Sequence, residues 1–257
     1  MAKSLTYDRC RTAVPAIEAG VFLVDKPVGP TSFRVVQWVR RALGIKKTGH
    51  TGTLDPFASG LLIICAGRPA TKIIPQLMAG DKEYEALLQL GKETDTQDLA
   101  GRVIAESPVP DLSDSEVRIC LSGFIGEQLQ TPPAFSALKH KGKPLYHYAR
   151  KGIMIAKEPR PVVIRQIDLL SRTADELAVR VRCGKGVYIR TLAADIGRVL
   201  GCGAHLRALR RTVNGAFSVN KAVCGAELAV PERGREILLD NIHPVAEVLE
   251  RLNKIDR

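Results

Sequence analysis

The sequence predicts a mixed α/β (α+β) fold, in which strands and amphipathic helices follow one another along the chain. Two periodicities indicate it. Apolar and polar residues alternate in 83–90 and 177–183, as in strands with one buried face. Apolar residues recur every three or four positions in 32–43, as on a helix that buries one side. With 257 residues, 45% of them hydrophobic, the chain can bury a substantial core.

The N-terminal part of the fold is expected to begin with a strand. Residues 1–20 lack a clear pattern, so we expect a loosely ordered extension there, followed by a strand at 21–24. After a proline-containing turn, Thr31 or Ser32 is expected to cap a helix that Gly44 ends. The predicted buried stripe of this helix consists of Val35, Val36, Val39 and Leu43.

The pattern of apolar and capping residues in the middle of the chain predicts two further strands and a helix. The apolar run 61–65 favours a short buried strand, and 83–90 places Tyr84 on the same face as three apolar side chains. Ser113 or Ser115 is expected to begin a helix, and a long polar loop is expected to start at 131. The apolar positions of that helix are Val117, Cys120, Leu121 and Phe124.

Residues 177–183 predict a strand that is solvated on one side, and 184–186 should turn it into a helix closed by Gly201. Arg190 falls in the first turn of that helix. The expected apolar positions are Ile189, Leu192, Ala193, Ile196, Val199 and Leu200. The 184–186 turn lacks the spacing of a phosphate-binding P-loop.

Composition narrows the class of protein. The formal net charge of +11 would attract a polyanion and suggests a nucleic-acid partner. The six cysteines form no Cys-x-x-Cys pair, which disfavours a zinc site or a disulfide scaffold and fits the cytoplasm. The N-terminus lacks the apolar core of a signal peptide, and no apolar stretch is long enough to span a membrane.

The run Gly49-His50-Thr51-Gly52-Thr53-Leu54-Asp55-Pro56 is the strongest candidate for a functional site. Its glycines, with Gly60, permit close backbone approaches, and Pro56 disfavours helical geometry at Asp55. An Asp-Pro pair is most often only a turn former. Here the run continues as Phe57-Ala58-Ser59-Gly60-Leu61-Leu62, and the whole stretch resembles the catalytic motif of the bacterial tRNA pseudouridine synthase B (TruB) family.

The resemblance recurs in the family's order from about Val21 to beyond Phe217. The matching stretches include Asp25-Lys26-Pro27, Lys82-Glu83-Tyr84, Thr94-Asp95-Thr96, Pro132-Pro133, Ser136-Ala137-Leu138-Lys139 and the run 185–192. It implies a pseudouridine synthase fold, with a bent, largely antiparallel central sheet flanked by helices and an active-site cleft across its middle. Many family members also carry a C-terminal RNA-binding PUA domain. We expect instead a catalytic domain at 21–225 and a helical tail at 226–257.

The resemblance also implies roles for individual residues. Asp55 would be the nucleophile and Arg190 its salt-bridge partner, while Tyr84 would face the uracil and take part in proton transfer. A fixed cation suits Asp55, because a carboxylate shielded from water otherwise tends to take up a proton. The expected substrate-binding residues are Lys26, His50, Tyr188 and Leu209. Taken alone, Tyr84 and Leu209 would be assigned to core packing and His50 to a turn.

Basic residues flank these motifs and are expected to contact RNA phosphates without reading sequence. They are Lys46, Lys47, Lys139, Lys141, Lys143, Arg150, Lys151, Arg207, Arg210 and Arg211. The chain departs from the family pattern at Phe135, where Tyr is usual, and at Gly184 and Val187, where Ser and Thr are commoner. A hydroxyl missing at Phe135 would weaken an RNA or structural hydrogen bond.

The function implied is isomerisation of uridine to pseudouridine at position 55, in the T loop of tRNA, after the base is flipped out. This reaction needs no cofactor and no metal. We expect the tRNA T stem-loop as partner, no membrane or obligatory protein partner, and a monomer. The alternative is an RNA-binding or tRNA-folding protein with incidental or no catalysis. A hydrolase or phosphotransferase is less consistent, because Phe57 stands where a second acid would help.

Overall fold

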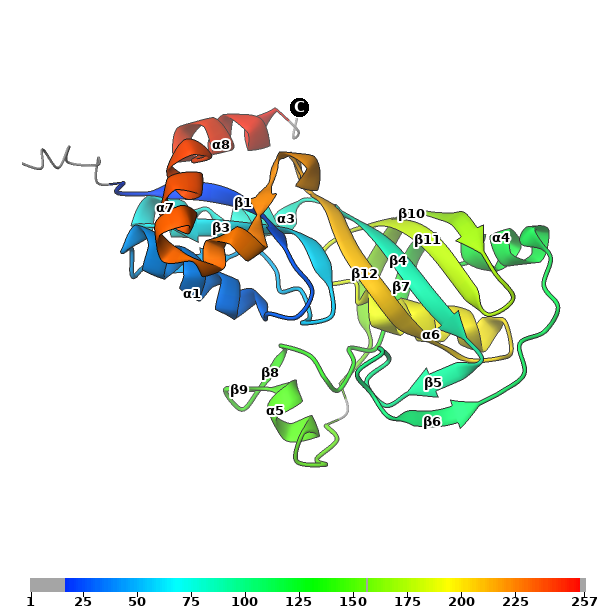
Figure 1. The fold of residues 1–257 in the computed structure, drawn as a ribbon. Coiled ribbons are helices and arrows are strands. Elements are labelled where there is room, and N and C mark those ends of the chain that lie inside the picture. Colours follow the sequence, from blue (N-terminus) through cyan, green and yellow to red (C-terminus); the bar gives the residue numbers. More distant parts are fainter. Residues whose placement is uncertain (1–16, 156, 255–257) are drawn as a thin grey trace, which may run out of the picture.

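One large mixed sheet runs through the molecule, with helices packed on it (Figure 1). The computed structural model describes residues 17–155 and 157–254. Most of the expected extension therefore lies outside the described residues. The ten-stranded sheet has the order β14-β1-β3-β12-β4-β11-β10-β7, with β2 and β13 attached to β3 and β12. Of its pairings only β1 with β14 and β3 with β12 are parallel, which confirms the largely antiparallel sheet.

The strands and helices are bounded as follows. The strands of the main sheet are β1 (Gly20–Lys26), β2 (Thr48–His50), β3 (Ser59–Ala66), β4 (Lys82–Leu90), β7 (Gly126–Gln130), β10 (Arg160–Arg172), β11 (Glu176–Cys183), β12 (Ala204–Asn214), β13 (Phe217–Ser218) and β14 (Val223–Cys224). Two small hairpins are β5 (Lys92–Thr94) with β6 (Val103–Glu106), and β8 (Lys139–His140) with β9 (Lys143–Pro144). The helices are α1 (Ser32–Leu43), α2 (Arg68–Lys72), α3 (Ile74–Ala79), α4 (Asp114–Ser122), α5 (Leu145–Ala149), α6 (Ile189–Val199), α7 (Pro231–Asp240) and α8 (Val245–Asn253), and 3-10 turns occupy Val219–Lys221 and Gly225–Ala229.

The first half of the sheet confirms the expected strand, helix and strand. Thr31 caps α1 by accepting a hydrogen bond from the Arg34 amide, and Gly44 ends the helix at φ 71°. The predicted stripe of α1 is buried against β1 and β3. Helices α2, α3 and α8 contribute to a second apolar cluster that includes other residues of the same two strands.

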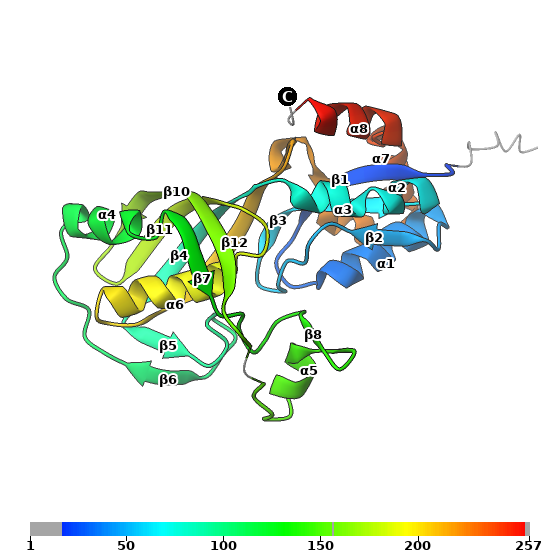
Figure 2. The same ribbon diagram turned by 180° about the vertical axis from the view of Figure 1, so that it is seen from behind.

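The second half of the sheet is built from β4, β11, β10 and β7, with α6 across one face (Figure 2). The strands β4 and β11 confirm the predicted alternation. Helix α6 is also as predicted, except that Val199 is exposed because it lies on the outer side of the last turn. Ser113 caps α4 with a full capping box, but Phe124 lies beyond the end of that helix.

Strand β12 joins the two halves, and its pairing was not predicted. It runs antiparallel to β4 over most of its length and pairs in parallel with the start of β3 at Ser59 and Gly60. Strands β7 and β10 were also not predicted. The expected polar loop after 131 in fact contains β8, β9 and α5, which project from the rest of the chain (Figures 1 and 2).

The C-terminal segment is helical and lies on the first half of the molecule. Helix α7 packs along α1, and Leu238 joins its apolar cluster. Helix α8 buries Val248 near β1. In the part of the chain that the structure describes, no helix combines the length and apolar character needed to cross a membrane.

Candidate active site

The loop that carries Asp55 lies between β2 and β3 and is tied down from three sides. The Ser32 hydroxyl, at the start of α1, donates to the Leu54 carbonyl at 2.9 Å and accepts from the Leu54 amide at 2.8 Å. The Thr51 amide donates to the Ile63 carbonyl, and the Gly29 amide donates to Pro56. These bonds fix the backbone on both sides of Asp55, so its carboxylate has a defined direction.

Lys26 supports the same loop from below. It is fully buried at the end of β1, and its ammonium donates to the carbonyls of Pro27, Pro30 and Pro56. Burial lowers its pKa to about 8, although the nearby Asp55 carboxylate acts in the opposite direction. An ammonium committed to three carbonyls braces the loop and does not line the cavity.

Arg190 faces Asp55 from the first turn of α6. Its Nε lies 2.9 Å from Asp55 Oδ2, and the guanidinium is almost completely buried while the carboxylate is about one-third exposed, at 34%. The remaining donors reach the carbonyls of Thr96 at 3.0 Å and Phe135 at 2.7 Å. Because arginine stays charged and its fork is fully engaged, it fixes the carboxylate and opposes its protonation.

A second carboxylate shares this arginine. Asp98 Oδ2 lies 3.4 Å from Arg190 Nη1, and Asp98 is itself buried. Its other oxygen accepts from the Thr96 hydroxyl and the Ala100 amide. Sequence reasoning stopped at Thr94-Asp95-Thr96 and missed Asp98; a carboxylate two residues beyond that matched motif was the available signal.

The ionisation of Asp55 reflects opposing effects. Burial is the largest and raises its pKa above the ordinary value, and the charge of Asp98 adds to that rise. Arg190 and Lys26 lower the pKa but do not reverse the shift. The carboxylate is thus held close to an arginine in a setting that weakens its hydration.

Asp55 and Arg190 open onto a cavity of about 350 Å³. Tyr84 from β4, Leu209 from β12 and Tyr188, which precedes α6, also line it. The Gln130 amide group brackets the Tyr188 backbone, accepting from its amide at 2.7 Å and donating to its carbonyl at 3.1 Å. A cavity of this size, with an anion, several cations and two aromatic side chains, suits a flat polar ring such as a nucleobase.

Family models match most of the chain. Residues 40–189 match the model described as TruB family pseudouridylate synthase, N terminal domain. The chain belongs to the TruB family. Residues 190–250 match a second model, described as the tRNA pseudouridylate synthase B C-terminal domain.

Curated TruB relatives are similar to this chain over most of its length. A tRNA pseudouridine synthase B of Desulfotalea psychrophila is 57% identical over 215 residues, covering 82% of this chain and 87% of the relative. One of Bordetella parapertussis is 50% identical over 228 residues, covering 88% of this chain and 93% of the relative.

Solved structures share the fold. A Cbf5-Nop10-Gar1 complex contains a chain that is 30% identical, with a TM-score of 0.69, covering 92% of this chain and 63% of that one. An H/ACA RNP bound to a substrate RNA containing 2′-deoxyuridine contains a chain that is 28% identical, with a TM-score of 0.64, covering 90% and 61%. This TruB chain therefore spans less than two thirds of the length of those solved chains.

The expected TruB site residues do not all meet at the cavity. Asp55, Tyr84, Tyr188, Arg190 and Leu209 line it. His50 lies on β2, outside the lining, with Nδ1 buried and without a hydrogen-bond partner. Burial and the charge of Arg211 lower the pKa of His50, which favours the neutral ring. Neither His50 nor Lys26 is thus placed for direct contact with a base in the cavity.

One expectation about the basic residues needs correction. Arg211 was grouped with surface cations, but only 2% of it is exposed and it lines the cavity from below. Arg210 is half-buried and forks onto Asp25 with bonds of 3.0 and 2.7 Å. The backbone carbonyl of Phe135 accepts a hydrogen bond from Arg190 at 2.7 Å, and the effect of the hydroxyl missing from its ring stays a prediction. No cluster suited to a metal ion occurs among residues 17–155 and 157–254.

Proposed function

We propose that this chain isomerises uridine to pseudouridine in tRNA, and that its target is the uridine at position 55 of the T loop. Membership of the TruB family and relatives that bear the name tRNA pseudouridine synthase B support the reaction and the substrate class. The choice of the T loop rests on the resemblance of residues 49–62 to the family's catalytic motif.

The observation that carries this proposal is the Asp55–Arg190 pair, which lines the cavity. The reaction breaks the bond between C1′ and N1, turns the base and joins C1′ to C5, while a proton leaves C5 and N1 gains one. No electrons are exchanged with another molecule. A carboxylate can serve as a temporary covalent partner for either the base at C6 or the sugar at C1′. Arg190 favours the ionised form of Asp55 for that role.

The rest of the cavity would hold the base while it turns. A uridine stacked in an RNA loop must be flipped out, at a cost of about a few kcal/mol. The ring of Tyr84 and the side chain of Leu209 supply flat and apolar contacts, and the walls exclude water from the detached base. We assign the Tyr84 hydroxyl to proton transfer.

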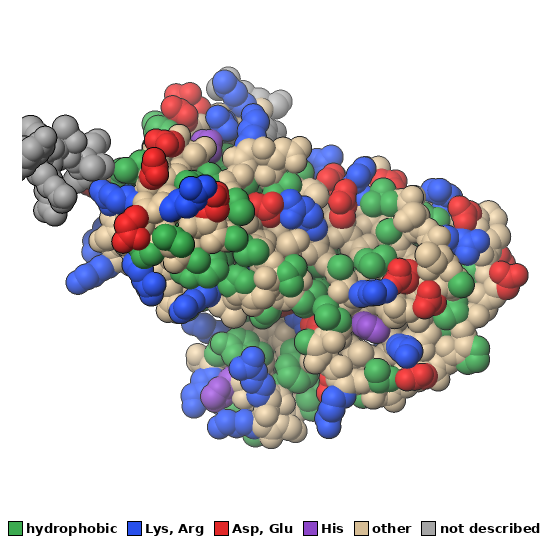
Figure 3. All heavy atoms as spheres, viewed as in Figure 1, with side chains coloured by type: hydrophobic (Ala, Val, Ile, Leu, Met, Phe, Trp, Pro, Cys, Tyr) green, Lys and Arg blue, Asp and Glu red, His purple; other side chains and the backbone are tan. Residues whose placement is uncertain are grey.

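The projecting segment with β8, β9 and α5 offers one surface for the RNA backbone. Its exposed cations are Lys139, Lys141, Lys143, Arg150 and Lys151. Figure 3 shows blue side chains over this segment, which faces the body of the molecule across a recess. Such contacts would orient tRNA through its phosphates and would weaken with added salt.

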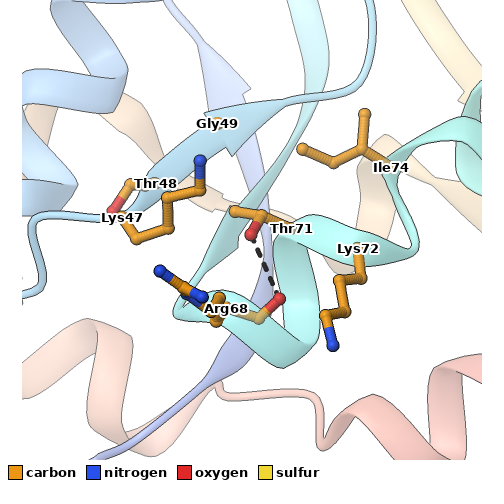
Figure 4. Close-up of a pocket in the computed structure, with 7 residues that line it drawn as sticks. All are labelled: Lys47, Thr48, Gly49, Arg68, Thr71, Lys72 and Ile74. Carbon is orange, nitrogen blue, oxygen red and sulfur yellow. Dashed lines mark hydrogen bonds between the residues drawn. The ribbon is translucent and has the colours of Figure 1, made fainter.

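A second basic surface lies beside β2 and α2. An open pocket of about 490 Å³ there is lined by Lys47, Arg68 and Lys72, together with Thr71 and Ile74 (Figure 4). All three cations are exposed. Lys47 belongs to the predicted Lys46–Lys47 cluster, so we assign this pocket to phosphate contacts of the same tRNA.

We also propose the domain division and setting that the sequence suggests: a catalytic domain at 21–225, a helical tail at 226–257, a monomer and a cytoplasmic location. The packing of α7 on α1 supports a tail that rests on the catalytic domain. Cys65, Cys120, Cys183, Cys202 and Cys224 are free thiols, as a reducing compartment favours.

Tritium release from C5 of uridine tests the proposed function. A tRNA transcript tritiated at uridine C5 is incubated with the unchanged chain, with Asp55→Asn and with Asp111→Asn, which alters an exposed aspartate in a loop. We expect release with the unchanged chain and Asp111→Asn, and none with Asp55→Asn. A transcript whose T-loop uridine is replaced should release no tritium. Tight tRNA binding without release would instead support the RNA-binding or tRNA-folding alternative.

A further inference from the structure

Arg211 occupies the point where three strands meet beneath the cavity. On β12 it lies opposite Tyr84 of β4 and, on the other side, opposite Gly60 of β3. A Cβ at Gly60 would come within 2.3 Å of the Arg211 carbonyl oxygen, so the two backbones touch. Directly after Arg211 the register of β12 shifts against β4, an irregularity that can re-aim a side chain next to a site.

The guanidinium of Arg211 is buried without a carboxylate. Its Nε donates to the Leu61 carbonyl at 2.7 Å and its Nη2 to the Gly52 carbonyl at 3.2 Å. No ion pair in the described part of the chain includes Arg211. Arginine stays charged in proteins, and burying a cation that has only carbonyl partners costs free energy. A role at the site would explain why such a residue is kept here.

Tyr84 is the neighbour on which this cation can act, because it lies directly opposite Arg211 on β4 and both side chains line the cavity. A guanidinium carries donors and no acceptor, so in a hydrogen bond between these two side chains the phenolic oxygen would be the acceptor. The hydroxyl hydrogen would then be directed away from Arg211 and be available to a group bound in the cavity.

The charges around Tyr84 act in the same sense. Burial is the largest effect and raises the pKa of the hydroxyl, and Cys183 on β11 and Asp55 on the catalytic loop raise it further. Arg211 on β12 lowers it by its positive charge. Among these neighbours, Arg211 is the group that favours negative charge on the phenolic oxygen.

We propose that Arg211 is a positioning residue for Tyr84, which holds the phenolic oxygen as an acceptor and presents the hydroxyl hydrogen to the base in the cavity. This inference rests on the proposed isomerase function. When the hydroxyl gives up its proton to the base, the adjacent guanidinium stabilises the charge left on the oxygen. Arg211 itself touches neither the base nor the sugar in this role.

A double-mutant cycle tests the coupling. Single-turnover rates of pseudouridine formation are compared for the unchanged chain, Arg211→Gln, Tyr84→Phe and the double variant. Arg180→Gln, an exposed arginine on the neighbouring strand β11, is the control for loss of a guanidinium. We expect Arg211→Gln to slow the reaction at least tenfold when Tyr84 is present and less than threefold when Phe replaces it. Equal losses in both backgrounds would overturn the proposal.

A second readout needs no activity. With 3,5-difluorotyrosine at position 84, fluorine NMR follows ionisation of the phenol against pH in the free protein. Arg211→Gln is expected to move that ionisation to higher pH by at least one unit, and Arg211→Lys, which keeps the charge, by less. An unchanged titration in a folded variant would overturn the proposal, as would failure of both variants to fold, since the role would then be structural. Inactivity of the unchanged chain on tRNA would refute the proposed function and leave this titration interpretable.

Discussion

Replacing Ser32 with alanine should slow the reaction, although Ser32 itself does not line the cavity. The Ser32 hydroxyl makes two hydrogen bonds to Leu54, the residue before Asp55, and both ends of this contact are buried. In Ser32→Ala the Leu54 amide loses its acceptor and its carbonyl loses a donor. The loop would then be held mainly by its flanking bonds at Thr51 and Pro56.

The expected loss of stability is modest and the expected loss of rate is larger. A buried amide left without a partner costs about 1–3 kcal/mol. A reacting group displaced by about 1 Å can lose roughly 100-fold in rate. We therefore expect Ser32→Ala to lower the free energy of unfolding by about 1–3 kcal/mol and the single-turnover rate by about 10- to 100-fold.

The neighbouring residue supplies a matched control. Thr31→Ala removes the cap of α1, a hydrogen bond from the Arg34 amide at 3.1 Å, and should cost about 1 kcal/mol. It leaves the Leu54 contact intact, so we expect a rate within about twofold of the unchanged chain. Urea unfolding and single-turnover assays on both variants decide the matter. If the two variants lose the same stability and the same rate, the loop contact does not position Asp55.

Three other outcomes are expected. Asp98→Asn removes a charge that raises the pKa of Asp55, so the acid limb of the pH–rate profile, where the ionised nucleophile is lost, should move to lower pH. Lys26→Met removes a buried ammonium whose pKa is about 8 in the folded chain. Because the unfolded chain binds that proton more tightly, the unchanged chain should become more stable relative to the variant as the pH rises from about 8 to 10. Urea unfolding across that pH range measures the difference. Gly60→Ala, at φ 101° with its Cβ against the Arg211 backbone, should destabilise far more than Gly126→Ala, where φ is 109° and nothing lies within 4 Å; equal melting temperatures would contradict this.

The sequence predicted those parts of the fold that depend on neighbours along the chain. Helix α1 and strands β4 and β11 carry clear periodicity, strand β3 is a continuous apolar run, and caps such as Thr31 and Ser113 mark where helices begin. Strand β12 escaped prediction because its arginines interrupt any alternation. Its place between β3 and β4 is decided by pairing across the sheet, which local pattern does not encode.

The same dependence on tertiary structure explains which site residues were not predicted. Asp55 and Arg190 were found through matched motifs, but the burial of Lys26 and Arg211 was not predicted. A run such as Arg210-Arg211 usually lies on a solvated face, and only tertiary structure shows that one side chain turns outward to Asp25 and the next inward to Leu61. Asp98 was likewise not predicted as a partner of Arg190, because it lies outside the matched motifs and only the tertiary structure brings the two side chains together.

The distribution of buried charge around the cavity has a consequence for the chemistry. The carboxylates of Asp55 and Asp98 share Arg190, while Lys82 and Arg211 lie nearby without a carboxylate of their own within ion-pair distance among the described residues. Cations in excess of carboxylates favour negative charge inside the cavity. A uracil released from C1′ carries its bonding electrons and is anionic until it is rejoined through C5. The side of the cavity formed by Lys82, Tyr84 and Arg211 is therefore suited to hold the detached base while it turns, and Asp55 and Arg190 to act on the bond that is broken and remade.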